Sequence, residues 1–240
     1  MLSKTEGIIL KNLKYGETSL IQDIYTKEYG LKSYIVSGVR KKKNSKAGAL
    51  QLMSMVELVA YHKKTNSLSR IKEIKPANYY HELPFDVLKS SIGLFITEVA
   101  RRSLSQDEQN EQLYAFLKDS YLYLDKAKGS LALFPILFLI KFSDHLGFSP
   151  SNNYSEECNC FHLMEGAFGQ MDSTSQYSLD SKISQYLYSL LFEEYGISND
   201  FVIPKMTRKE LLKQMVNFYR IHIDGFGKLN SLDILHELFD

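Results

Sequence analysis

The feature that most constrains the fold is a change in the spacing of apolar residues near Pro76. Up to about residue 75, short apolar runs alternate with turn-forming residues, a pattern typical of β-strands. Beyond Pro76 the apolar residues recur every three or four positions, a pattern typical of helix faces. The sequence therefore predicts an α+β protein, with a β-domain first and an all-α domain after it.

Five strands are predicted in the first domain. They cover residues 5–13, 18–26, 31–39, 55–61 and 68–74. Five short strands in about 75 residues fit a small closed β-barrel of the oligonucleotide/oligosaccharide-binding type, the OB-fold. A five-stranded SH3-like barrel has the same strand number, so the count alone leaves both folds open.

Six helices are predicted after Pro76. They include residues 88–99, 113–124, 131–146, 183–194, 207–223 and 231–239. The helix at 131–146 is apolar on nearly all sides, which indicates the buried centre of the domain. Ser105–Glu108 and Thr207–Glu210 match the capping-box pattern at helix starts. We assign residues 1–78 to an OB-fold domain and 79–240 to a helical domain, with an irregular excursion at about 149–178.

The two parts of the chain differ in charge, although the net charge of the whole chain is only +1. Residues 1–75 hold 15 Lys and Arg against 6 Asp and Glu, whereas the remainder holds 14 against 22. The first part therefore carries +9 and the second −8. Such a division favours a β-domain that faces a polyanion.

A basic stretch, GVRKKKNSKAGALQ, follows the third predicted strand and is the strongest local signal. The cations of this stretch repel one another, so their mutual interaction gives no stabilisation. They are therefore free to neutralise phosphates. The predicted DNA-binding residues in this stretch are Arg40, Lys41, Lys42, Lys43 and Lys46. The cations predicted to extend the patch around the barrel are Lys14, Lys32, Lys63, Lys64 and Arg70, together with Lys72.

Tyrosines in the same domain offer flat rings on which unpaired bases can stack. They are Tyr15, Tyr25, Tyr29, Tyr34 and Tyr61. Strand alternation favours a core position for at least half of them, and the sequence singles out none as a stacking residue.

Enzyme motifs are missing from the sequence. It has no Gly-rich phosphate loop, no Gly-x-Ser-x-Gly elbow and no HExxH pair, so we expect no catalytic residue and no cofactor. His222 falls on the apolar face of its helix, where a hydrogen-bonded core histidine is the expectation. Cys158-Asn-Cys160-Phe-His162 is the one metal-like cluster, and without a second cysteine pair we expect no metal site.

The sequence also predicts where in the cell the protein is located. Its longest apolar run, Leu131–Ile140, is too short to cross a bilayer, and Met1–Leu10 lacks the apolar core of a signal peptide. Two cysteines this close bridge poorly, which fits a reducing compartment. We therefore expect a cytoplasmic protein without membrane association.

Six short motifs occur in order along the chain. They are Gly16–Ser19, Thr26–Gly30, Ser37–Lys41 with Ser45, Ala49–Gln51, His145–Phe148, and Leu229–Ser231 with Leu232 and Leu235. Their order and spacing resemble the bacterial recombination-mediator and DNA-repair family RecO. The chain departs from the family at Leu52, where a proline is frequent, and at Cys158 and Cys160, where many members carry a four-cysteine zinc module. The excursion is therefore expected to be a degenerate form of that module.

The resemblance implies a non-enzymatic protein of the nucleoid that binds single- and double-stranded DNA and anneals complementary strands. It also implies help in loading RecA onto strands coated with single-strand-binding protein, and partnership with RecR and with the acidic C-terminal tail of that protein. The tail needs an apolar pocket beside a cation, for which Arg101, Arg102 and Lys141 are candidates. The first two are equally well explained as a solvated helix end.

Three alternatives stay open from the sequence. One is a scaffold whose barrel docks an acidic protein surface, and another is an RNA-binding OB-fold protein. The third is an enzyme whose site lies in the helical part.

Overall fold

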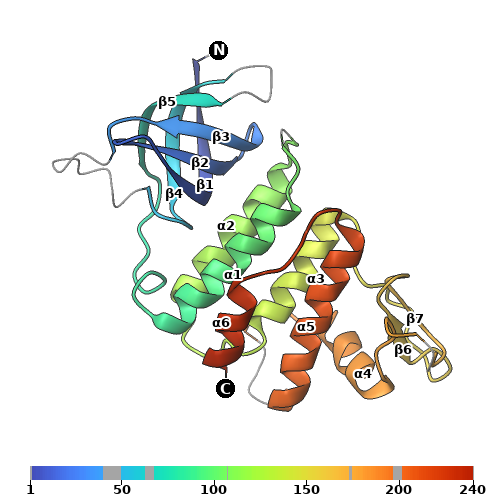
Figure 1. The fold of residues 1–240 in the computed structure, drawn as a ribbon. Helices are drawn as coiled ribbons and strands as arrows, with labels where there is room; N and C mark the ends of the chain where they lie inside the picture. Colours follow the sequence, from blue (N-terminus) through green and yellow to red (C-terminus); the bar gives the residue numbers. More distant parts are fainter. Residues whose placement is uncertain are drawn as a thin grey trace. The chain divides into compact units, whose positions relative to one another are not determined.

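The chain forms two compact units in a computed structural model, residues Met1–Lys126 and Ala127–Asp240 (Figure 1). The structure describes residues 2–39, 50–62, 68–106, 108–172, 175–196 and 202–239. The predicted domain boundary at residues 78 and 79 follows the change from strands to helices, whereas the first compact unit also includes two helices. The domain boundaries stay a prediction.

The strands of the first unit close into a barrel. They are β1 (Leu2–Tyr15), β2 (Ser19–Thr26), β3 (Gly30–Val36), β4 (Met55–Tyr61) and β5 (Ser69–Pro76). Their order around the barrel is β1-β2-β3-β5-β4, and the β3–β5 pair is parallel while the other pairs are antiparallel. The predicted five-stranded barrel is confirmed, and it is an OB-fold.

Strand β1 is long because it serves two neighbours. Residues 2–8 pair with β4 and residues 7–15 pair with β2, with a register shift between Ile9 and Lys11. Such a bulge bends a strand and increases its twist, which helps β1 to reach both edges. The inward side chains, among them Ile9, Ile24 and Val56, form one apolar core in the barrel.

Two helices complete the first unit, α1 (Val87–Ser103) and α2 (Glu111–Lys126). Asp86 caps α1 by accepting the N–H of Lys89 at 2.8 Å. Asn110 Oδ1 accepts the N–H of Leu113 at 2.9 Å at the start of α2. The predicted capping box at Ser105–Glu108 is therefore wrong, since this segment runs outside the helix and pairs at Gln106 with Leu31 of the barrel.

A buried carboxylate fixes the turn that enters α1. Asp125, only 3% exposed, accepts the backbone N–H groups of His81, Glu82 and Leu83 at 2.8 to 3.1 Å. Burial alone raises the pKa of Asp125, but these hydrogen bonds favour the charged form and hold the pKa below its ordinary value. The end of α2 and the start of α1 are joined in this way.

The second unit is mainly helical (Figure 1). Its elements are α3 (Phe134–Leu146), β6 (Cys160–His162), β7 (Ala167–Gly169), α4 (Ser181–Leu190), α5 (Lys205–His222) and α6 (Ser231–Leu238). Helix α3 ends at Gly147, whose φ of 83° is a left-handed conformation that favours glycine. Nine of its residues are buried, which confirms α3 as the predicted centre.

The predicted capping box at Thr207–Glu210 is also wrong. Helix α5 begins two residues earlier, at Lys205, and Pro204 at its N-cap position has no side-chain hydrogen bond to offer. Thr207 therefore lies inside the first turn. Proline immediately before a helix start makes the earlier beginning favourable because its φ is already close to the helical value.

The excursion forms a β6–β7 hairpin closed by aromatic contacts. Phe161 packs against Phe168 of the hairpin and Phe218 of α5, with ring centroids 5.1 and 5.7 Å apart. His222 Nε2 lies 2.9 Å from the carbonyl oxygen of Leu163, so His222 is a hydrogen-bonded structural residue as predicted. Apolar and aromatic packing holds the hairpin to the helices.

Candidate nucleic-acid interface

The cations predicted to bind DNA fall into two groups. The larger group lies outside the described residues, and it comprises Arg40, Lys41, Lys42, Lys43, Lys46, Lys63 and Lys64. The described group is Lys14, Lys32, Arg70 and Lys72, and Lys72 Nζ lies 3.9 Å from Glu73 Oε1. Lys14 and Arg70 are exposed at the ends of β1 and β5, where they are accessible to a ligand on the barrel surface.

Lys32 lies in a different environment. It is half-buried and pairs with Ile24, a core residue, so its side chain starts toward the inside of the barrel. His62 lies at the same end, stacked on Tyr29 with ring centroids 3.8 Å apart. Burial, and then the charge of Lys32, lower the pKa of His62 below its ordinary value. Both effects favour the neutral form of the His62 imidazole.

The barrel tyrosines separate by burial. Tyr25 and Tyr34 are almost completely buried, and Tyr29 packs on His62, so these three rings contribute to the packing of the fold. Tyr15 is 51% exposed and Tyr61 is 48% exposed. The rings that remain accessible for stacking are thus at the end of β1 and the end of β4.

Lys11 is a cation that the sequence reasoning missed. It is exposed on β1 and, by strand alternation, shares one face with Leu13 and Tyr15. The signal was present in the sequence as a Lys-x-Leu-x-Tyr alternation. Lys11 lies within the predicted strand at residues 5–13, but the register shift between Ile9 and Lys11, which decides the face on which Lys11 falls, has no signal in the sequence.

The cations predicted for partner binding each have an acidic partner within their own unit. Arg101 Nε lies 2.6 Å from Asp23 Oδ2, and Asp23 also accepts a hydrogen bond from Ser33. The side chain of Asp23 is only 7% exposed, so this pair joins α1 to the barrel. Arg102 pairs with Glu98 one turn earlier in α1. Lys141 of α3 lies 2.8 Å from an oxygen of Glu194.

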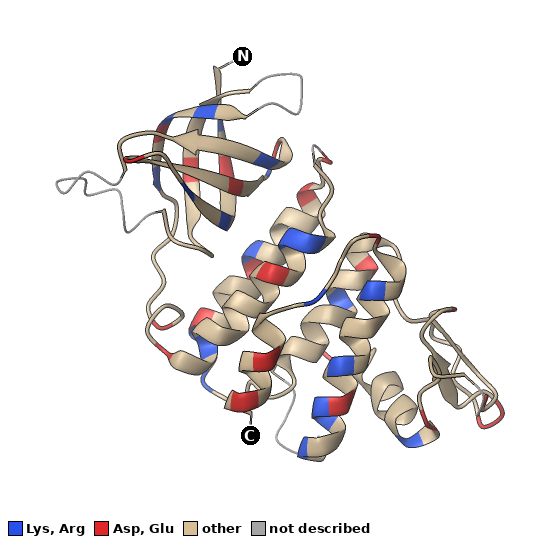
Figure 2. Cartoon of the chain, viewed as in Figure 1, with Lys and Arg blue, Asp and Glu red and all other residues tan. Residues whose placement is uncertain are grey.

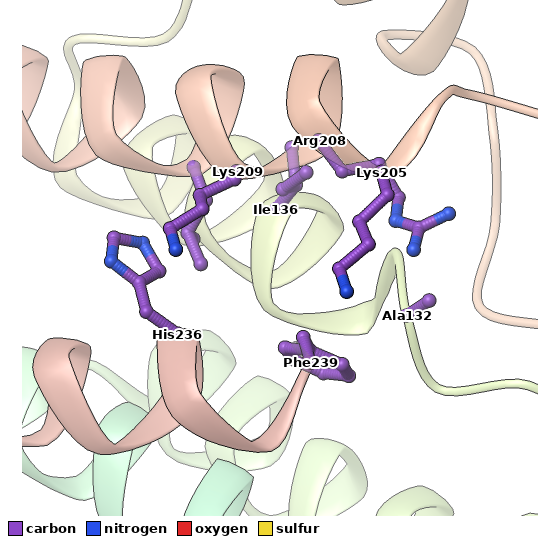
Figure 3. Close-up of a pocket in the computed structure, with 8 residues that line it drawn as sticks. Ala132, Ile136, Lys205, Arg208, Lys209, His236 and Phe239 are labelled. Atoms are coloured by element: carbon purple, nitrogen blue, oxygen red, sulfur yellow. The ribbon is translucent and has the colours of Figure 1, made fainter.

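A pocket in the second unit combines apolar and basic side chains (Figure 3). It is lined by Ala132, Ile136, Lys205, Arg208, Lys209, Leu212, His236 and Phe239. In Figure 3 the side chains of Lys205 and Lys209 extend from α5 toward α6, which carries His236. Arg208 Nη1 donates to the carbonyl oxygen of Ile203 at 2.9 Å, which fixes the guanidinium.

Neither a metal cluster nor a membrane helix is present in the part of the chain that the structure describes. No group of three or more His, Cys, Asp and Glu side chains is placed to hold a metal. Cys160 is buried, which raises the pKa of its thiol, and His162 Nε2 lies 3.0 Å from the carbonyl oxygen of Gln170. Among the same residues, no helix has the length and apolar character needed to cross a bilayer.

Comparison with known families accounts for nearly the whole chain. The family model described as "Recombination protein O N terminal" matches residues 1–80, and the one described as "Recombination protein O C terminal" matches residues 84–233. The chain belongs to the RecO family. The two models meet between the last strand of the barrel and the start of α1.

RecO relatives match over the full length of both chains. The DNA repair protein RecO of Phocaeicola vulgatus is 36% identical over 241 residues, and that of Flavobacterium psychrophilum is 34% identical over 241 residues. That of Christiangramia forsetii is 32% identical, also with complete coverage of both chains. The resemblance inferred from the six motifs is confirmed, and the chain is a DNA-repair protein of the RecO family.

Proposed function

We propose that this RecO-family protein is a non-enzymatic mediator that binds single- and double-stranded DNA through its barrel and anneals complementary single strands. The observation that carries the proposal is an OB-fold barrel with exposed cations, Lys11, Lys14 and Arg70, inside a segment of charge +9. OB-folds bind oligonucleotides on one barrel face and its adjoining loops. The stretch Arg40–Lys43 follows the last residues of β3 in the sequence.

Annealing then follows from electrostatics. Two complementary strands repel each other through their phosphates, and a cationic surface lowers that repulsion by replacing counterions. No covalent bond is made or broken, so no nucleophile, general base or cofactor is required. The proposed role also implies association with the nucleoid.

An annealing assay tests this proposal. With two complementary labelled oligonucleotides, the protein is expected to speed duplex formation roughly 10- to 1000-fold at low salt, because a cationic surface raises encounter rates. The acceleration should need no nucleotide cofactor and should fall as salt rises. Fluorescence quenching between the two labels measures the rate. An unchanged rate, or a strict requirement for ATP, would contradict the proposal.

We further propose that the pocket beside α5 receives the acidic C-terminal tail of single-strand-binding protein. An acidic tail with apolar residues needs an apolar floor next to cations, and this pocket offers Ile136 and Leu212 beside Lys205, Arg208 and Lys209. None of the described residues that line it is acidic. This contact would bring the barrel to coated strands, where RecR joins and RecA is loaded.

Charge reversal within the pocket should weaken tail binding. Lys209→Glu places a carboxylate beside the acidic peptide, and like charges in close contact reduce affinity by about tenfold or more. Lys213→Glu, one turn later on α5, is the matched control because Lys213 does not line the pocket. Calorimetry with a synthetic tail peptide measures both. If the two substitutions weaken peptide binding equally, the pocket is not the binding site of the tail.

A further inference from the structure

A row of side chains crosses the outer surface of the barrel from strand to strand. Strand register places Leu13 opposite Ile21, Ile21 opposite Ile35, Ile35 opposite Arg70, and Arg70 opposite Tyr61. Paired residues on neighbouring strands point to the same face, so the members of this row lie side by side. Tyr61 is also opposite Leu2 of β1, so the row runs around the closed barrel, and the members that lie together around Tyr61 are Leu2 and Arg70.

Tyr61 and Arg70 point outward, because their neighbours along each strand are buried. Ala60 and His62 flank Tyr61, Ser69 and Ile71 flank Arg70, and all four are at most 9% exposed. By contrast, Tyr61 is 48% exposed, and Leu2, opposite it on β1, is 42% exposed. Large apolar side chains that gather in one place on a surface indicate an interaction site.

A cation lies beside Tyr61. Arg70 is directly opposite Tyr61 on β5 and is exposed. Lys63 and Lys64 follow Tyr61 within three residues in the sequence. Flat apolar side chains next to cations are complementary to a strand that presents unpaired bases and phosphates together.

We propose that Tyr61, with Leu2 and Arg70 opposite it on the two neighbouring strands, forms the platform on which unpaired bases stack, with Tyr61 as the main stacking ring. The inference rests on the proposed DNA-binding function and adds a selectivity to it. Duplex DNA keeps its bases stacked inside, so it can use the phosphate contacts but not the platform. The barrel therefore binds single strands more tightly than duplexes of the same length.

Substitution of Tyr61 tests the platform. Tyr61→Ala should weaken binding to a labelled single strand roughly 5- to 100-fold, since stacking of one base on an aromatic ring contributes about 1–3 kcal/mol. Affinity for duplex DNA should change less than about twofold, and the salt dependence should stay the same because no phosphate contact is lost. Tyr61→Phe should retain single-strand binding. Tyr79→Ala is the control, because Tyr79 is 75% exposed but lies outside the barrel strands.

A direct optical test uses the absence of tryptophan from this sequence. Tyr61→Trp introduces a single indole, whose fluorescence should be quenched by a single strand. An oligonucleotide of abasic sites and a duplex should quench it little. Trp at position 79 in a Tyr79→Trp variant should respond to none of the three.

The outcomes separate this inference from the proposed function. If the unaltered protein binds no DNA, both are overturned. If it binds DNA but Tyr61→Ala leaves single-strand affinity unchanged, or weakens single-strand and duplex binding equally, the platform alone is overturned. Equal quenching of the Tyr61→Trp variant by abasic and base-bearing strands would overturn it as well.

Discussion

Replacement of Arg40, Lys41, Lys42 and Lys43 by alanine is expected to weaken single-strand binding by roughly two to three orders of magnitude at about 0.1 M salt. Each phosphate contact on a single strand contributes about 0.7 to the slope of log K against log salt, so four lost contacts lower log K by about 2.8 at this concentration. The physical reason is that each of these four side chains, when it binds a phosphate, releases counterions from the DNA. Fluorescence anisotropy of a labelled oligonucleotide measures the change.

A second variant with the same loss of charge separates local contacts from net charge. In this control variant, four exposed cations outside the barrel are replaced by alanine: Lys126, Lys128, Lys182 and Lys213. This control should lower affinity far less, because none of its cations belongs to a barrel strand or to the stretch Arg40–Lys46. Equal losses in the two variants would mean that DNA binding depends on the number of cations and not on their place in the chain. Figure 2 shows Lys and Arg on the barrel strands and on the helices.

The second large effect is expected at Gly30, for the stability of the unit Met1–Lys126. Gly30 has a φ of 61°, and a Cβ there would lie 2.3 Å from the carbonyl oxygen of Glu108. Gly30→Ala therefore forces the α1–α2 connection away from the barrel, in addition to the strain of a left-handed alanine. We expect the free energy of unfolding of this unit to fall by about 3 kcal/mol or more.

Gly16 provides the matched control, since its φ is 58° but a Cβ there would meet nothing within 4 Å. Gly16→Ala carries only the conformational strain, about 1–2 kcal/mol. Urea unfolding followed by circular dichroism compares the two variants. If the two variants lose the same free energy of unfolding, the close approach of Gly30 to the α1–α2 connection does not contribute to stability.

The fold could be predicted largely from the sequence because its signals are local. Alternating apolar runs marked the strands, and repeats at three and four residues marked the helices, including the apolar α3 that ends at Gly147. Helix starts were less predictable. Ser105 and Thr207 match a capping pattern, but tertiary contacts of Gln106 with the barrel and Pro204 before α5 decide where the helices begin.

The surface of the barrel could be predicted only in part. The basic stretch was visible in the sequence, but the side on which each tyrosine falls depends on strand register and the bulge in β1. The pocket between α3, α5 and α6 joins Ile136, Lys209 and His236, which lie up to 100 residues apart. The carboxylates that pair with Arg101 and Lys141 are likewise distant in the sequence, so neither contact has a local signal.

The salt dependence of single-strand binding by the unaltered protein tests the central claim most directly. If the barrel binds phosphates through five cations of the stretch Arg40–Lys46, log K should fall against log salt with a slope of roughly −3.5. In the Arg40–Lys43 alanine variant the slope should become shallower by roughly 2.8, because four contacts are lost. A slope near zero for the unaltered protein, or the same slope in both proteins, would contradict the account.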